Sequence, residues 1–164
     1  MRAILDFGAG ALRHTLPLLK AGFEVCAVEF ERGFQREVAA EALRRAQEDG
    51  HFTSLIWPHD YLANGRRFDA ALLCYVTQTM PVPKERARVL KGLAKKLKRD
   101  SYVLYMSRYN QGAANIASRQ RVSDGFYMWP KREQHSFYRE FSTPETHEMF
   151  SDYGFRYIRC LSQR

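Results

Sequence analysis

ILDFGAGALR at residues 4–13, followed by VCAVE at 25–29, decides the fold of this chain. In each stretch a short apolar run ends in an acid, and a glycine-rich turn and a helical pattern that stops at Gly22 lie between them. This order predicts a β-α-β unit with strands at 3–6 and 24–30. The glycine turn at the carboxyl end of the first strand predicts a nucleotide-type site.

Strands and helices alternate along the rest of the chain. The apolar runs predict strands at 52–57, 69–75, 101–107 and 155–161, and the amphipathic patterns predict helices at 33–48 and 84–99. The helix-start signal Ser-Thr-Pro-Glu at 142–145, in which Ser142 is the cap, predicts a further helix at 143–153. Within the first of these helices, the inward-facing residues should be Phe34, Val38, Ala42 and Leu43. The alternation predicts an α/β fold: a doubly wound, mostly parallel sheet with helices on both faces.

The length of 164 residues fits one domain over 1–164. The segment 108–141 is the exception to the alternation, because it mixes arginines and aromatic residues without a clear period. A segment that long between a strand and a helix is uncommon unless it covers a site. We therefore expect 108–141 to be a substrate-side insertion or a lid.

Bulk properties narrow the class of protein. The formal net charge of +8 favours anionic partners such as nucleic acid or phosphorylated metabolites, although a soluble enzyme with a basic surface explains it equally well. Cys26, Cys74 and Cys160 show no C-x-x-C spacing, so we predict no metal site and a reducing, cytoplasmic setting. No apolar run approaches 18 residues and no signal region opens the chain, so we predict neither a membrane span nor secretion.

Two classes of cofactor use a glycine turn of this kind. Dinucleotide-binding folds carry G-x-G-x-x-G/A, in which the third small residue lets the helix pack closely on the strand. Gly8 and Gly10 fit that pattern, but Arg13 occupies the third position. Arg13 disfavours a nicotinamide oxidoreductase, which stays an alternative.

Asp6, two residues before Gly8, completes a turn that resembles the first motif of the class I S-adenosylmethionine-dependent methyltransferases. Later stretches resemble that family's motifs in the same order, at 18–29, 59–61, 68–80, 89–97 and 142–155. The resemblance implies a Rossmann-like methyltransferase fold and S-adenosylmethionine as the cofactor. Members of the family usually end with an antiparallel strand, which we expect to be missing here because the sequence stops soon after residue 161.

The resemblance implies a set of cofactor-binding residues. Glu29 would accept hydrogen bonds from the two ribose hydroxyls, and Asp60 would accept from the adenine amino group. Glycines let the backbone approach the cofactor closely, and Cys74 ends the fourth strand beside the transferred methyl group. The implied cofactor-binding residues are Asp6, Gly8, Gly10, Glu29, Asp60 and Cys74.

Plainer roles compete with some of these assignments. Asp6 could simply cap the turn that follows it, Glu31 could replace Glu29, and Asp60 could be an ordinary loop acid. The catalytic residue stays unassigned. Candidates for it are Tyr75, His14 and His59.

The acceptor of the methyl group is less well defined. The Asn/Asp/Ser-Pro-Pro-aromatic motif of base-amine methyltransferases is absent from 73–76, which favours a small-molecule acceptor over a base amine. Basic residues crowd the predicted helix 84–99, and a solvated helix face is the plainer explanation for them. Arginines interleaved with aromatics in 108–141 would suit a stacked base, an anionic ring substrate or a lid over any flat substrate. The alternative function is a non-catalytic S-adenosylmethionine-binding module or a nucleic-acid-binding methyltransferase subunit.

Overall fold

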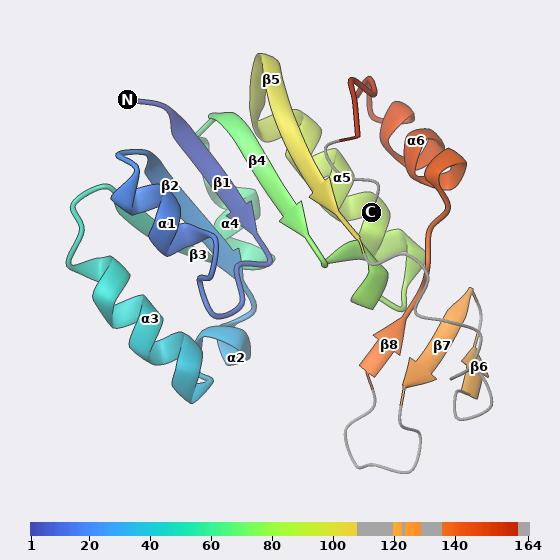
Figure 1. The fold of residues 1–164 in the computed structure, drawn as a ribbon, viewed down its shortest axis with the longest axis horizontal. Coiled ribbons are helices and arrows are strands. Elements are labelled where there is room, and N and C mark those ends of the chain that lie inside the picture. The colour runs from blue at the N-terminus through green and yellow to red at the C-terminus, as the bar shows by residue number, and fades with distance from the viewer. Residues whose placement is uncertain (108–119, 123, 129–135, 161–164) are drawn as a thin grey trace. The chain divides into compact units, whose positions relative to one another are not determined.

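The computed structural model describes residues 1–107, 120–122, 124–128 and 136–160 (Figure 1). The chain divides into two compact units. Unit 1 comprises Met1–Thr77 and Lys96–Met106, and unit 2 comprises Gln78–Lys95 and the described residues from Ser107 onward. The prediction of one domain over 1–164, with 108–141 as an insertion or lid, stays a prediction.

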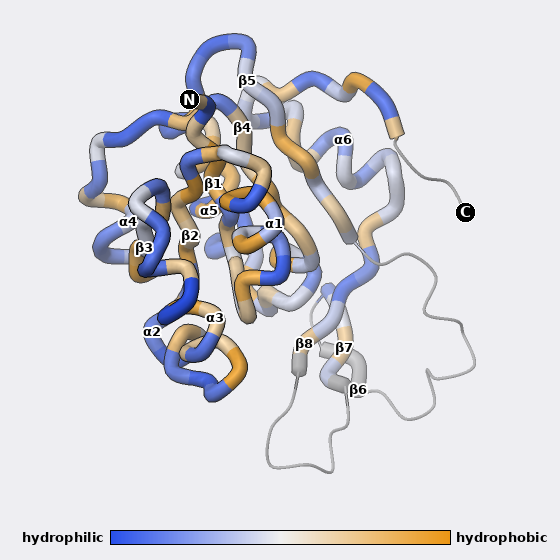
Figure 2. The backbone as a smooth tube through the Cα atoms, turned by 60° about the vertical axis from the view of Figure 1, so that its left-hand side comes forward, coloured by the Kyte–Doolittle hydropathy of each residue, from blue (hydrophilic) through white to orange (hydrophobic). Residues whose placement is uncertain are grey.

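Unit 1 is built on a five-stranded parallel sheet in the order β3-β2-β1-β4-β5. The central strand β1 is buried along its whole length, and Figure 2 shows apolar residues concentrated in β1 and β2. This arrangement confirms the predicted doubly wound α/β fold. The strands are β1 Ala3–Phe7, β2 Glu24–Glu29, β3 Phe52–Ile56, β4 Phe68–Cys74 and β5 Leu97–Met106.

Helices lie on both faces of this sheet. Helix α1 packs on β2 and on α3, whereas α4 packs on β3 and lies on the opposite face (Figures 1 and 2). A 3-10 turn, η1, follows β4. The bounds are α1 Thr15–Lys20, α2 Glu31–Phe34, α3 Glu37–Gln47, α4 His59–Ala63 and η1 Thr77–Thr79.

The helix predicted at 33–48 is wrong as a single element, because it is divided into α2 and α3. Arg36 has an extended backbone, with φ of −63° and ψ of 138°, so a new helix begins at Glu37. Phe34 and Ala42 are buried as predicted, but Val38, also predicted to face inward, is 69% exposed and Ala39 is buried instead. The buried residues of α3 are Ala39, Ala42 and Ala46.

Unit 2 contains helix α5 and, among the described residues, a small antiparallel sheet in the order β6-β7-β8 and a final helix α6. Val89, Leu90 and Leu93 of α5 are fully buried. Ser142 caps α6 in a capping box with Glu145, as the cap signal in the sequence predicts. The bounds are α5 Pro83–Lys96, β6 Gln120–Val122, β7 Gly125–Met128, β8 Ser136–Tyr138 and α6 Thr143–Ser151.

The strand predicted at 155–161 is wrong for residues 155–160, which form neither a helix nor a strand; Leu161 lies outside the described residues. Two of its apolar side chains are open to solvent, since Tyr157 is 58% and Ile158 is 67% exposed. An apolar run forms a strand only where a neighbouring strand pairs with it. Residues 155–160 belong to neither of the sheets that the described residues form.

Candidate functional site

The register of the sheet gathers the strand ends of unit 1 at one edge. Strand β1 lies between β2 and β4, and Phe7 pairs with Val28 on one side and with Leu73 on the other. Ligands of open parallel sheets bind at the carboxyl edge, where the strand order reverses, and β1 lies at that point. The residues that leave the sheet there at the same level are Gly8, Glu29 and Cys74.

Gly8 occupies a turn position that has no room for a side chain. Its φ of +73° lies in the left-handed region, and a Cβ built on it would lie 2.4 Å from Cγ2 of Val76, just beyond β4. The amides of Gly8 and Ala9 both donate to the carbonyl oxygen of Val28, at 2.8 and 3.1 Å. The turn is therefore held against the end of β2, and Val76 approaches it closely.

Glu29 is half-buried at the end of β2, and both of its carboxylate oxygens accept backbone hydrogen bonds. Oε2 accepts from the amide of Gly10 and Oε1 from the amide of Phe30, each at 2.8 Å. A carboxylate has about four acceptor positions, so these two bonds leave capacity for hydroxyl donors from a ligand. Glu29 thus has a defined orientation beside the glycine turn.

Gly33, in α2, lies directly against Glu29. A Cβ added there would come within 2.5 Å of Cγ and 2.9 Å of Oε1 of Glu29. Sequence reasoning missed this contact because Gly33 stood at the start of a predicted helix. The available signal was a glycine inside a helical pattern, four residues after an acid that ends a strand.

Asp6 is only 2% exposed, and its Oδ2 accepts a hydrogen bond of 2.7 Å from the hydroxyl of Thr15. Burial raises the pKa of Asp6, and the charge of Glu29 raises it further, whereas Thr15 and His14 lower it. Asp6 therefore ties the end of β1 to the start of α1, as its plainer role as a turn cap suggests. Thr15, fully buried, was missed from the sequence because its partner lies nine positions away.

Asp60 is exposed on α4, and its Oδ2 accepts from the amide of Ile56 at 3.1 Å. Ile56 pairs with Glu29 across β2 and β3, so the turn that Asp60 closes follows β3 at the edge where Glu29 lies. The structure thus brings Asp60 to the same edge of the sheet as the glycine turn.

Cys74 and Tyr75 mark the end of β4. Burial raises the pKa of the Cys74 thiol to about 11, with a further contribution from the charge of Asp6, so the thiol is protonated at neutral pH. Tyr75 is 41% exposed, and its φ of +60° lies in the left-handed region. A non-glycine residue there stores on the order of 1–3 kcal/mol, and such strain collects at functional sites.

His14 and His59 are both exposed and come from separate elements: His14 precedes α1 and His59 begins α4. Neither is assigned a proton-transfer role by its contacts. The described residues contain no group of three or more His, Cys, Asp and Glu side chains suited to a metal ion. Several residues of the predicted substrate-side segment lie outside the described residues: Arg108, Tyr109, Arg119, Trp129, Lys131 and Arg132.

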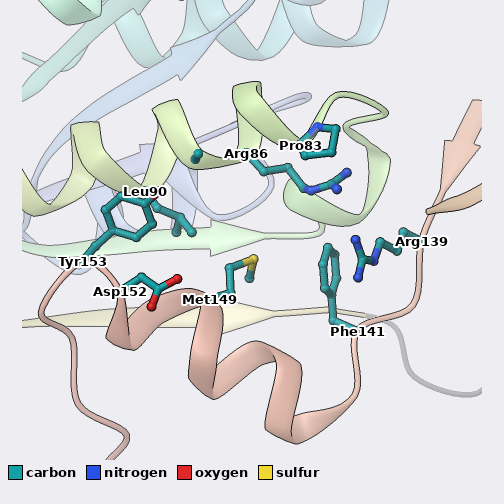
Figure 3. A pocket seen from close by; sticks show the side chains of 9 residues that line it. Pro83, Arg86, Leu90, Arg139, Phe141, Met149, Asp152 and Tyr153 are labelled. Atoms are coloured by element: carbon teal, nitrogen blue, oxygen red, sulfur yellow. The ribbon is translucent and has the colours of Figure 1, made fainter. Parts of the chain in front are cut away.

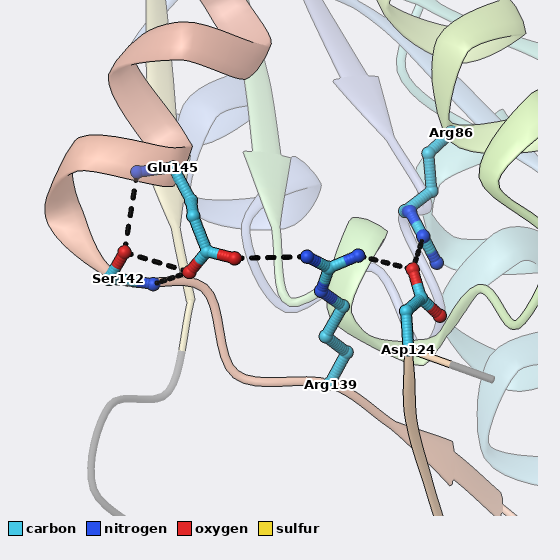
Figure 4. Close-up of polar contacts among 5 residues, drawn as sticks. All are labelled: Arg86, Asp124, Arg139, Ser142 and Glu145. Atoms are coloured by element: carbon cyan, nitrogen blue, oxygen red, sulfur yellow. Dashed lines mark hydrogen bonds and ion pairs between the residues drawn. The ribbon is translucent and has the colours of Figure 1, made fainter. Parts of the chain in front are cut away.

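Unit 2 contains a network of ion pairs (Figure 4). Asp124 Oδ2 accepts from both Arg86 and Arg139, and Arg139 also pairs with Glu145 at 3.0 Å. Arg86 is 5% exposed and donates a further hydrogen bond to the carbonyl oxygen of Met80. Burial lowers the pKa of Arg86, while the charge of Asp124 opposes that shift. Oδ1 of Asp124 is buried without a hydrogen-bond partner among the described residues.

Beside this network, a cavity of about 180 Å³ lies between α5 and α6 (Figure 3). Phe141 lines it, with the guanidinium of Arg139 at 4.6 Å and that of Arg86 at 5.6 Å from its ring. Both guanidinium groups already form ion pairs with Asp124 within unit 2. We therefore assign no ligand to this cavity.

No protein-family model and no curated protein matches the chain. Among solved structures, a SAM-dependent methyltransferase from Methanosarcina mazei superposes with a TM-score of 0.71 at 18% identity, over 93% of this chain and 78% of that one. The 1,6-didemethyltoxoflavin-N1-methyltransferase of Burkholderia thailandensis gives a TM-score of 0.65 at 22% identity, over 96% of this chain and 62% of that one. This chain therefore spans less than two thirds of the Burkholderia enzyme's length.

A third neighbour is the magnesium protoporphyrin IX methyltransferase of Synechocystis, with a TM-score of 0.66 at 18% identity, over 96% of this chain and 66% of that one. The chain has the Rossmann-like fold of the class I methyltransferases. This fold agrees with the one that the resemblance of the motifs implies. Among the described residues, no helix combines the length and the apolar character that crossing a membrane requires.

Proposed function

We propose that the chain is an S-adenosylmethionine-dependent methyltransferase and that unit 1 binds the cofactor. The observation that carries the proposal is Glu29, which accepts from the amide of Gly10 in the turn after β1, the strand at which the order reverses. The fold supports it, and the Burkholderia and Synechocystis neighbours were solved with bound S-adenosylhomocysteine.

The residues at this edge fit such a cofactor. Glu29 would accept from both ribose hydroxyls. Gly8 has no side chain, and one added there would collide with Val76. Asp60 would accept from the adenine amino group through the part of its carboxylate that does not hold Ile56. Asp6 keeps the turn closed through Thr15.

When bound, the cofactor supplies a methyl group on a sulfonium centre, which a nucleophile can displace. The residues of this chain would contribute by positioning, and alignment of two reactants accounts for a large part of catalysis. Cys74 and Tyr75 would border the methyl group, and the protonated Cys74 thiol would be an uncharged neighbour of it. Tyr75, His14 and His59 remain the candidates for the catalytic residue.

We favour a small-molecule acceptor, selected by 108–141 and the end of β4. The absence of the base-amine motif at 73–76 supports this choice. The Burkholderia neighbour, solved with 1,6-didemethyltoxoflavin, shows that the fold serves small acceptors elsewhere. A cytoplasmic location, suggested by the cysteine usage, is part of the same proposal.

Calorimetry with S-adenosylhomocysteine tests the cofactor site. Charge-assisted hydrogen bonds contribute about 1.5–3 kcal/mol each, so losing two to the ribose in Glu29→Ala should weaken binding about 100-fold or more. Glu31→Ala is the matched control, because Glu31 is exposed two positions away and should leave binding unchanged. Wild-type affinity in Glu29→Ala would overturn the assignment of the ribose site.

One observation favours a second candidate, nucleic-acid binding. Helix α5 exposes four basic side chains along one face, opposite its buried leucines. A single acid, Glu85, lies in the same helix, where it pairs with Arg88 at 3.7 Å. Clustered exposed cations are the electrostatic footprint of phosphate-backbone binding. The four are Lys84, Arg88, Lys91 and Lys95, spaced at i, i+4, i+7 and i+11.

Fluorescence anisotropy with a random-sequence DNA duplex separates the two candidates. Backbone binding through this face requires an affinity that falls with salt by about 0.9 logarithmic units per phosphate contact. The triple variant Lys84→Gln, Lys91→Gln, Lys95→Gln should then flatten the salt dependence. The control triple Lys20→Gln, Arg32→Gln, Arg45→Gln removes the same charge from exposed positions of unit 1. Negligible binding at about 50 mM salt would leave the small-molecule enzyme as the sole candidate.

A further inference from the structure

We propose that Gly33 is a positioning residue for the cofactor site: it lacks a side chain so that Glu29 can keep the orientation that binds the ribose. This inference rests on the proposed role of Glu29. Gly33 belongs to none of the motifs that indicate a methyltransferase, and it lies outside the residues predicted from the sequence to bind the cofactor.

The contact is too close for any side chain. A Cβ on Gly33 would meet Glu29 at 2.5 Å from Cγ, 2.8 Å from Cδ and 2.9 Å from Oε1, distances that real Cβ atoms essentially never show. Gly33 is buried, and its amide donates to the carbonyl oxygen of Phe30 at 2.8 Å. Because the backbone of Gly33 is held in this turn, Glu29 is the group that would move.

Movement of Glu29 would break the bonds that orient it. Oε1 would leave the amide of Phe30, and Oε2 would leave the amide of Gly10. The Gly10 bond spans 19 positions and joins the end of β2 to the glycine turn. A methyl group at position 33 would therefore disturb both the acid and the turn without touching the ligand.

The backbone of α2 gives no other reason for a glycine. Gly33 has no left-handed φ, so an alanine can adopt its conformation, and alanine favours a helix over glycine. Glu29 is a flexible side chain that can rotate away, so the fold should tolerate the change. The distinguishing expectation is a loss of cofactor affinity in a protein that still folds cooperatively.

The experiment is a double-mutant cycle of Gly33→Ala and Glu29→Ala, with binding of S-adenosylhomocysteine measured by calorimetry and thermal midpoints measured for every variant. Gly33→Ala should weaken binding about 10- to 100-fold while its thermal unfolding stays cooperative. Gly33→Ala should weaken binding no further in the Glu29→Ala background, because a residue that acts through Glu29 is non-additive with it. Gly50→Ala, at an exposed glycine with nothing within 4 Å of an added Cβ, is the matched control and should bind like the wild type.

The outcomes separate this inference from the proposed function. Wild-type binding by Glu29→Ala would remove the proposed ribose site, whatever Gly33 does. A strong loss in Glu29→Ala with wild-type binding in Gly33→Ala would overturn the positioning role alone. Additive losses would overturn it as well, because Gly33 would then act independently of Glu29. Unfolding of Gly33→Ala would also overturn it, because the added methyl group is expected to displace only the Glu29 side chain, which can rotate.

Discussion

Glu29 and Asp60 of unit 1 are held in a different way from Asp124 of unit 2. In unit 1, Glu29 and Asp60 accept hydrogen bonds from backbone amides. In unit 2, Asp124 accepts instead from two guanidinium groups, those of Arg86 and Arg139. A carboxylate held by amides depends on the shape of the turn that presents them. A carboxylate held by side chains depends on the charge of its partners, so the two regions should fail under different substitutions.

Changing the glycine turn should produce the largest effect. Gly8→Ala combines a left-handed φ with a Cβ only 2.4 Å from Val76. Backbone strain and overpacking each cost about 1–3 kcal/mol, so we expect a loss of roughly 3 kcal/mol or more in the free energy of unfolding. Urea denaturation measures it. Gly8→Ala combined with Val76→Ala should recover part of the loss, because only the steric collision is relieved; equal losses would mean that Val76 is not the obstacle.

Removing the bridging charge in unit 2 should come next. Asp124→Ala leaves the buried Arg86 without its carboxylate, and breaking a buried pair costs roughly 3 kcal/mol. Denaturation followed by circular dichroism measures the change. The control is Glu85→Ala, whose contact with Arg88 is exposed and should be worth less than about 0.5 kcal/mol. Similar small losses in both variants would show that the network contributes little to stability.

This difference also explains how much could be predicted. The strands that contain Asp6 and Glu29 can be predicted from the local sequence, because a buried run, a glycine turn and a helix follow one another along the chain. The structure places these strands side by side, as expected. The Arg86–Asp124 pair joins residues 38 positions apart, on a helix and beside a hairpin. No local pattern signals such a pair. The same limit applies to Thr15 and Gly33, whose partners are defined only once the turn is folded.

Two errors in the predicted elements have a related cause. The pattern at 33–48 continues across Arg36, but the backbone is extended there and the helical phase begins again. The apolar run at 155–160 satisfies the local preferences of a strand, yet Ile158 is exposed and unpaired in the described sheets. Periodicity contains no information about where a helical backbone breaks or whether a neighbouring strand is present to pair.

A smaller effect is expected from the hydrogen bond that closes the glycine turn. Thr15→Val removes the hydroxyl that donates to the buried Asp6, and an unsatisfied buried acceptor costs about 1–3 kcal/mol. Thr15→Ser keeps the donor and should lose less than Thr15→Val. The free energy of unfolding from urea titrations measures both. If Thr15→Ser loses more than Thr15→Val, packing of the Thr15 methyl group outweighs its hydrogen bond.

The smallest effect is expected from removing the charge of Asp6. Burial raises the pKa of Asp6 above its ordinary 3.8, so its contribution to stability is fully present below that pH and is lost as the pH rises through the folded-state pKa. Ionised Asp6 therefore weakens the fold at neutral pH. In Asp6→Asn the amide oxygen can still accept from Thr15 while this pH dependence disappears, so the variant should gain stability relative to the wild type between about pH 4 and pH 7. Unfolding free energies measured across that range should diverge as the pH rises; parallel curves would mean that burial does not penalise the charged form.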